Sequence, residues 1–145
     1  MPEPRHKLID FPSFDTKNGI LCMIQHDSKK DIAVPFKMKK VLSITGMKDS
    51  DKRGGHTHHK THQILICTSG QCVVDLEDGE NKSSVTLNKP NQGLLLYPYI
   101  WHEMHSFSPN TTLLVIADRE YDEKEYIRDY NEFKKWASKK IKKGK

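Results

Sequence analysis

Short apolar runs recur through the chain and are separated by glycine, proline and asparagine signals. The runs are rich in β-branched and aliphatic residues, and they cover 19–25, 38–45, 62–67, 71–77, 83–87, 93–97 and 111–117. Ser69-Gly70 and Asp78-Gly79 have the composition of hairpin turns. Short strands at roughly 8–12-residue spacing are typical of an all-β sandwich or barrel, so we predict an all-β fold.

The hydrophobic period changes near the C-terminus. Asp122 and Glu125 have the spacing of a capping box, which often begins a helix. Apolar and aromatic residues then follow at helical spacing: Tyr126, Tyr130, Phe133 and Ala137. We predict one C-terminal helix whose aromatic stripe packs on the β core. The chain is then a single domain over residues 1–137, followed by a lysine-rich tail over 138–145.

Length and composition are those of a soluble protein with a real core. A chain of 145 residues is long enough for one domain. No apolar stretch approaches the length of a membrane span, and the N-terminus lacks the apolar run of a secretory signal. The three cysteines, Cys22, Cys67 and Cys72, lie in apolar segments and are expected to be reduced, buried thiols. We therefore expect a cytoplasmic protein with no membrane partner.

The positive charge is concentrated at one end of the chain. The formal net charge is +5, but residues 134–145 hold seven lysines and no acid, which leaves −2 for residues 1–133. A body without excess positive charge is unlike a nucleic-acid-binding protein, so we expect no nucleic-acid partner. The lysine-rich end is interpreted as a solvated helix end or fray, with a weak contact to an anion as the alternative.

Half of the eight histidines lie in one short segment, RGGHTHHKTHQ, residues 53–63. Histidine titrates near neutral pH and is also a common metal ligand. If this segment is extended, His56 and His58 point to one face and His59 to the other, because side chains alternate along a strand. Two histidines that point into the mouth of a small β-barrel are interpreted as a functional pair.

The histidine segment resembles the first motif of the cupins, which is H-x-H followed by a hairpin that ends in glycine. Gly70 fits that glycine, but Gln63 stands where metal-binding cupins have a glutamate ligand. His102 resembles the histidine of the second cupin motif. Glutamine is a poor substitute for an anionic ligand, so we predict no metal. A site built from His56, His58, His62 and His102 remains the alternative.

Three segments together resemble the bacterial nucleotide-sugar 3,4-ketoisomerases, also called the WxcM-like family, which act on dTDP-4-keto-6-deoxyglucose. They are residues 53–79, 93–107 and 119–136, which carry R-G-x-H-x-H, P-x-x-W-H-E-M and Y-D-E-x-x-Y-I-R-x-Y. The resemblance extends from about residue 32 to residue 136. It implies a cupin-type β-barrel (jelly roll), usually a homodimer, with no metal or organic cofactor and a dTDP-linked 4-keto-6-deoxy sugar as its partner.

The resemblance also implies roles for particular residues. The family's second motif histidine is its proton-transfer base and maps onto His58, with His56 beside it. The motif arginine maps onto Arg53, which is expected to contact the diphosphate. The other residues predicted to bind substrate are Lys40, Tyr97, Trp101, His102, His105 and Arg128.

One segment departs from the family pattern. The family often has R-V-Y-Y-I before the histidine motif, whereas this chain has residues 40–44 as KVLSI. Lys40 keeps a positive charge for a phosphate, although without the bidentate geometry of arginine. The family's active-site tyrosine is absent at Leu42-Ser43. Either Tyr97 or Tyr99 replaces it, or the substrate differs.

The predicted chemistry is a proton shuttle. In a 4-keto sugar the C3 proton lies next to a carbonyl, and a base can remove it to give an enediol. The same base can return a proton at C4 and so move the ketone to C3. The developing oxyanion needs donors, for which His56, His102 and His105 are candidates. The product would be aminated during surface-polysaccharide synthesis. The alternatives are a 3,5-epimerase, a metal-dependent oxygenase and a non-catalytic sugar-binding cupin.

Overall fold

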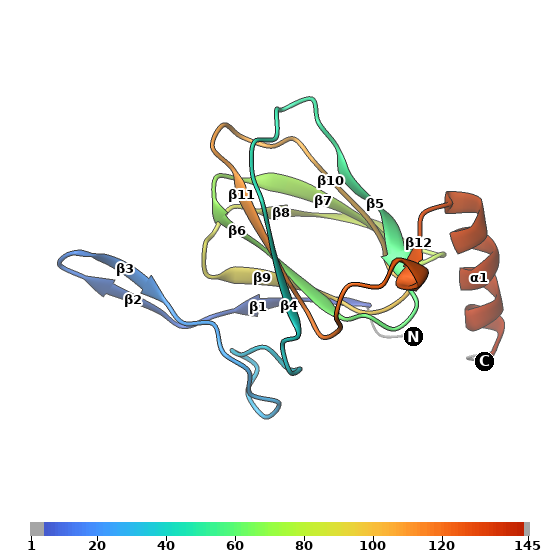
Figure 1. The fold of residues 1–145 in the computed structure, drawn as a ribbon, viewed down its shortest axis with the longest axis horizontal. Coiled ribbons are helices and arrows are strands. Elements are labelled where there is room, and N and C mark those ends of the chain that lie inside the picture. Colours follow the sequence, from blue (N-terminus) through green and yellow to red (C-terminus); the bar gives the residue numbers. More distant parts are fainter. Residues whose placement is uncertain (1–4, 144–145) are drawn as a thin grey trace.

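The computed structural model describes residues 5–143, without the side chains of residues 140–143. Two five-stranded antiparallel sheets pack face to face, a two-stranded hairpin projects from one end, and one α-helix lies at the C-terminus (Figure 1). This double-sheet arrangement is the jelly roll that cupins use, and it confirms the predicted all-β fold with one C-terminal helix. Residues 5–143 include no helix long and apolar enough to cross a membrane.

The two sheets draw their strands from the whole length of the chain. The first sheet has the order β1 (His6–Asp10), β9 (Gln92–Leu96), β6 (Gln63–Ser69), β11 (Thr112–Ala117) and β4 (Lys40–Ile44). The second has the order β12 (Tyr126–Ile127), β5 (Arg53–His58), β10 (Trp101–His105), β7 (Cys72–Glu77) and β8 (Lys82–Leu87). The projecting hairpin pairs β2 (Ser13–Thr16) with β3 (Gly19–Cys22). Each of the seven predicted apolar runs overlaps one of these strands.

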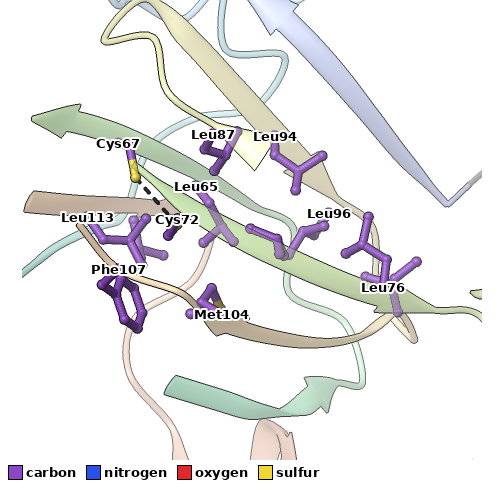
Figure 2. Packing of buried hydrophobic residues seen from close by; sticks show 13 residues of the cluster. Leu65, Cys67, Cys72, Leu76, Leu87, Leu94, Leu96, Met104, Phe107 and Leu113 are labelled. Carbon is purple, nitrogen blue, oxygen red and sulfur yellow. Dashed lines mark hydrogen bonds between the residues drawn. The ribbon is translucent and has the colours of Figure 1, made fainter. Parts of the chain in front are cut away.

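The main core fills the space between the two sheets (Figure 2). Alternate residues of facing strands meet there, such as Leu65 from β6 and Leu76 from β7. Cys67 and Cys72 face each other across the sheets with their Sγ atoms 3.4 Å apart, and both are buried free thiols, as predicted. Cys22 is only half-buried because it lies in the projecting hairpin, so the expectation of a buried thiol is wrong there.

A second apolar cluster covers the outer face of the first sheet. It joins side chains of the sheet to the N-terminal segment: Ile9, Phe11, Val34, Ile64, Ile66, Leu95 and Ile116. Strand β6 is therefore buried on both faces, which explains why its sequence is a continuous apolar run rather than an alternating one.

The C-terminal helix begins later than its sequence pattern predicts. Helix α1 spans Tyr130–Lys143. Asp122 instead caps a short 3₁₀ helix, η1 (Glu123–Glu125), because its side chain accepts a hydrogen bond from the Lys124 backbone. Tyr126 then turns into β12, which pairs with β5, so it does not belong to the helix. The predicted capping box and the first member of the aromatic stripe are wrong.

The rest of the aromatic stripe packs as predicted. Phe133 and Ala137 are buried against Ile127, with Trp101 of β10 beside them, so the helix is attached to the outer face of the second sheet. The predicted tail at 138–145 has no boundary of its own in the structure, because α1 continues through Lys143. Its last two residues lie outside the described residues.

Candidate active site

Three neighbouring strands place four aromatic rings on the inner face of the second sheet. In the pairing of β5 with β10, His56 lies opposite His102, and in the pairing of β5 with β12, His58 lies opposite Tyr126. The ring centroids of His56 and His58 are 5.0 Å apart, and those of His56 and His102 are 4.7 Å apart. The Tyr126 ring lies 4.5 Å from His58 and 5.1 Å from His56. The predicted same-face arrangement of His56 and His58 is confirmed.

His59 faces the other way, as strand alternation predicts. Its ring lies 6.4 Å from Tyr99 and 6.0 Å from Trp136 of the C-terminal helix. The fourth histidine of the segment, His62, also lies apart from the cluster, because its Nδ1 atom is 2.9 Å from a carboxylate oxygen of Asp118. Only two of the four clustered histidines therefore meet on the inner face.

Two glycines shape the strand that carries the histidines. Gly54 and Gly55 have φ angles of 85° and 71°, which residues other than glycine rarely adopt. A Cβ atom on Gly54 would lie 2.9 Å from the backbone oxygen of His102, where the pairing of β5 with β10 also shifts register. The Arg-Gly-Gly segment thus lets β5 approach β10 closely enough for the histidine rings to meet.

His56 and His102 line a cavity of about 380 Å³ between the two sheets, and His58 adjoins it through its contact with His56. This volume lies within the usual range for a small-molecule site. Its floor is apolar, with Leu65, Met104 and Val115, whereas Arg53 and Arg128 lie among its basic lining residues. A cavity with histidine and basic side chains suits a ligand that carries an anionic group and can exchange a proton.

A larger hollow of about 740 Å³ lies on the outer face of the second sheet but lacks this chemistry. No histidine lines it. Its buried carboxylate, Glu77, already accepts hydrogen bonds from the Tyr130 hydroxyl and from the Lys134 ammonium group. We therefore place the candidate active site in the smaller cavity.

The structure brings together most of the predicted site residues. Arg53, His56, His102 and Arg128 line the cavity. Two more predicted residues adjoin the lining: the His58 ring lies 5.0 Å from that of His56, and the Lys40 Nζ atom lies 5.9 Å from the ring centroid of Tyr126, itself a lining residue.

Three predicted substrate contacts lie elsewhere. The His105 Nε2 atom is 2.8 Å from an Asp75 carboxylate oxygen, and His105 is not among the residues that line the cavity. Trp101 packs beside the C-terminal helix. The Tyr97 ring lies 5.6 Å from His62. Strand alternation accounts for this in β10, where His102 and Met104 are buried and the residues between and beside them are half-buried.

Tyr126 is a site residue that the sequence reasoning missed. It lines the cavity beside Leu42, the residue that stands where the resembled family often has a tyrosine. Neither Tyr97 nor Tyr99, the two residues considered as replacements, lines this cavity. The signal that could have identified it is the triplet Tyr126-Ile127-Arg128. A buried apolar residue between two more exposed polar ones alternates as in a strand and not as in a helix.

The segment that carries Tyr126 is held by charged contacts. The Arg128 guanidinium lies 4.5 Å from the centre of the Tyr126 ring, and its Nε atom donates a hydrogen bond of 2.8 Å to Glu123. Tyr121 donates a hydrogen bond to the same carboxylate. These contacts fix Arg128 over the tyrosine, where it lines the cavity.

The three clustered histidines, His56, His58 and His102, are held in their neutral forms. Burial, together with the charges of the nearby His102 and His56, lowers the pKa of His58 to about 2. Burial followed by the charge of His102 lowers the pKa of His56 to about 3, and burial lowers the pKa of His102 to about 4. Neutral imidazoles offer lone pairs, so these residues can accept a proton but cannot all be charged together.

The donor set does not fit the metal that many cupins hold. Within residues 5–143, no group of three or more histidine, cysteine, aspartate or glutamate side chains is placed to bind a metal ion. Gln63, at the position of the cupin glutamate ligand, supplies no anionic oxygen and instead lies with its Nε2 atom 3.1 Å from the His102 Nε2 atom. The residues present therefore disagree with a metal-dependent mechanism.

Comparisons with known proteins identify the family of the chain. A family model described as "FdtA: WxcM-like, C-terminal" matches residues 4–138. A TDP-4-oxo-6-deoxy-α-D-glucose-3,4-oxoisomerase from Aneurinibacillus thermoaerophilus is 39% identical over 134 residues, which are 92% of this chain and 94% of that protein.

Solved structures give the same result. A variant of the 3,4-ketoisomerase QdtA from Thermoanaerobacterium thermosaccharolyticum, in complex with TDP-4-keto-6-deoxyglucose, matches with a TM-score of 0.87 and 36% identity, over 93% of this chain and 95% of that one. The TDP-quinovose 3,4-ketoisomerase WlaRB from Campylobacter jejuni matches with a TM-score of 0.82 and 35% identity, over 90% and 97% of the two chains.

Proposed function

The chain belongs to the FdtA, WxcM-like family, and from this premise we propose that it is a dTDP-4-keto-6-deoxyglucose 3,4-ketoisomerase. The observation that carries the proposal is the pair of neutral histidines, His56 and His58, of which His56 lines a cavity with basic lining residues and His58 packs directly behind it. It is an isomerase, because the reaction moves a ketone within one molecule. No cofactor is needed, since every step is a proton transfer.

His58 is the proposed base. Its neutral imidazole removes the C3 proton of the 4-keto sugar, and the electron pair of the C3–H bond forms the C3=C4 double bond of an enediolate. The same imidazolium then returns a proton to C4. The proton on the C3 oxygen must move to the C4 oxygen, a role for His56, whose ring lies beside His58, or for a bound water. The ketone thereby passes from C4 to C3.

The charge of the substrate explains how a buried histidine can act as the base. In the empty cavity, burial disfavours the charged form of His58. Proton removal creates an imidazolium and an enediolate side by side, so the two charges stabilise each other. The diphosphate supplies further negative charge, for which Arg53 and Arg128 are the proposed partners. Substrate binding therefore raises the proton affinity of the base when it is needed.

The proposal predicts which protons exchange in D2O. Incubation with dTDP-4-keto-6-deoxyglucose should give a 3-keto sugar whose C5 proton is retained, as followed by proton NMR. Deuterium enters at C3 of recovered substrate or at C4 of product, to the extent that His58 exchanges its proton with solvent. Partial retention of the original proton would support a single base that serves both carbons.

The same experiment separates the alternatives. A 3,5-epimerase would exchange the C5 proton and leave the ketone at C4. A sugar-binding protein would give shifted resonances and no new sugar, and a metal-dependent oxygenase would require metal and O2. A ketone that stays at C4 would contradict the proposed function for this substrate.

We also propose that the protein is a homodimer. The projecting hairpin exposes 51% of Phe14, 68% of Ile20 and 55% of Leu21. The edge strand β4 exposes 58% of Val41 and has unpaired backbone groups on its outer side. A two-stranded hairpin is marginally stable alone, and apolar edge strands are usually covered. A second copy of the chain could cover both surfaces reciprocally by two-fold symmetry.

The hairpin predicts the oligomeric state of two variants. Joint replacement of Phe14 and Leu21 by glutamate should produce a monomer, because it places charges in the apolar surface proposed for the interface. Lys17→Glu is the matched control, since Lys17 is an exposed residue in the turn of the same hairpin. Analytical ultracentrifugation should find the control dimeric. A monomeric wild type, or a dimeric double variant, would contradict the proposal.

We propose a cytoplasmic location, where nucleotide sugars are made. The 3-keto group of the product is a substrate for amination, so the next enzyme would be an aminotransferase in the synthesis of a surface polysaccharide such as lipopolysaccharide.

A further inference from the structure

We propose that Gln63 is a positioning residue which fixes the tautomer of His102, and that His102 consequently supports His56 without binding the substrate. Both residues line the candidate cavity, and they come from opposite sheets, Gln63 from β6 and His102 from β10. The effect of this tautomer on catalysis rests on the proposed function, whereas the tautomer itself can be measured without any substrate.

The first ring nitrogen of His102 carries the proton. The His102 Nδ1 atom lies 3.3 Å from the backbone carbonyl oxygen of Ile100. A carbonyl oxygen can only accept a hydrogen bond, so Nδ1 must be the donor in this contact. A deprotonated Nδ1 would instead set two lone pairs against each other inside the protein.

The second ring nitrogen is therefore an acceptor. His102 is 1% exposed, and its full burial disfavours a doubly protonated, charged ring. With the proton on Nδ1, the Nε2 atom presents a lone pair, and the partner 3.1 Å away is the amide nitrogen of Gln63. That amide donates its N–H. The opposite amide orientation would again place two acceptors together, so only one arrangement satisfies both contacts.

This arrangement leaves His102 no free hydrogen-bonding group. The proton on Nδ1 is used by Ile100, and the lone pair on Nε2 is used by Gln63. The His102 ring instead packs against His56 at an interplanar angle of 78°, directly opposite it across the strand pair. We therefore revise the expectation that His102 donates to the oxyanion or contacts the sugar.

The glutamine matters because a carboxylate would reverse the pattern. An ionised glutamate at position 63 can only accept, so it would pull a proton onto His102 Nε2. His102 would then either lose its bond to Ile100 or become an imidazolium whose ring lies 4.7 Å from His56. A positive charge there would further oppose protonation of His56 and His58 during catalysis.

The test is nitrogen NMR of the histidine rings in the full-length, ¹⁵N-labelled protein at pH 7.5, with His102→Gln used to assign the signals. Wild type should show His102 protonated at Nδ1 and unprotonated at Nε2. Zinc chloride at one equivalent should leave both signals unchanged. An Nε2–H or doubly protonated ring in wild type, or a stoichiometric shift of these signals with zinc, would overturn the proposal.

Replacing Gln63 with glutamate or with methionine, whose side chains are of similar length, tests the hydrogen-bond donor of the amide separately from the space that the side chain fills. Gln63→Glu should move a proton to His102 Nε2, whereas Gln63→Met should keep the Nδ1–H signal because Ile100 still accepts from it. In turnover of dTDP-4-keto-6-deoxyglucose, Gln63→Glu should lose about 10–100-fold, the scale found for outer partners of metal-ligating histidines. The loss should fall on kcat. An unchanged tautomer in Gln63→Glu, or an effect confined to KM, would overturn the positioning role.

An inactive wild type would have a different meaning. It would contradict the proposed function while leaving the tautomer measurement intact, because that measurement uses no substrate. If Gln63→Glu fails to fold, the wild-type spectrum and the Gln63→Met spectrum still decide the assignment of the proton.

Discussion

Replacing His58 with asparagine is expected to lower kcat by about 10²–10⁴-fold, the usual contribution of a general acid–base group, while the fold is kept. Asparagine matches the size and polarity of histidine but cannot accept a proton and return it. His58 is 5% exposed and its ring lies against His56 and Tyr126, so its removal acts in the buried histidine cluster and not at the surface. His56→Asn should also lose much of the activity, though less than His58→Asn.

His59→Asn is the matched control for this prediction. His59 directly follows His58 but faces Tyr99 and the C-terminal helix, so its loss should leave turnover within about twofold, on the small scale of changes outside the site. Circular dichroism and thermal melting should show that all three variants are folded. Near-wild-type turnover by a well-folded His58→Asn protein would remove His58 from the mechanism.

The sequence predicts the strands whose burial is uniform. The runs that became β6, β9 and β11 are continuous and apolar because the first sheet is covered on both faces. Such runs can only lie in the interior, so their identification needs no knowledge of the neighbours. The turns at Gly70 and Gly79 were equally predictable from the sequence, because both glycines adopt the positive φ angles that favour this residue.

The site was less predictable because it depends on irregular strands. Strand β5 begins with Arg-Gly-Gly and approaches β10 closely. The pairing of the two strands shifts register there, which no local sequence pattern predicts. Tyr126 happens to stand at helical spacing from Tyr130, although it pairs with β5 instead. The contact of Gln63 with His102 joins residues 39 positions apart in two different sheets, so only the tertiary structure could show it.

The neutral histidines also make the stability of the fold depend on pH. His56, His58 and His102 have folded pKa values of about 3, about 2 and about 4, whereas an unfolded histidine has a pKa of about 6.5. Below pH 6.5 the unfolded chain therefore binds protons that the folded chain does not. The free energy of unfolding should have its maximal value above pH 6.5 and fall as the pH drops toward 5. The fall is about 1.4 kcal/mol per pH unit for each histidine that is neutral in the folded state and protonated in the unfolded state.

The size of that slope can be assigned to the cavity by removing one of its histidines. Urea unfolding of wild type between pH 7.5 and pH 5 gives the number of protons taken up on unfolding. In His58→Asn this number should fall by nearly one at pH 5, because one neutral, buried histidine is gone. His59→Asn is again the comparison, since the His59 ring lies outside the cluster that holds the neutral forms. Equal slopes in wild type and His58→Asn would mean that His58 is already able to take up a proton in the folded protein, and the neutral base proposed for the reaction would then be wrong.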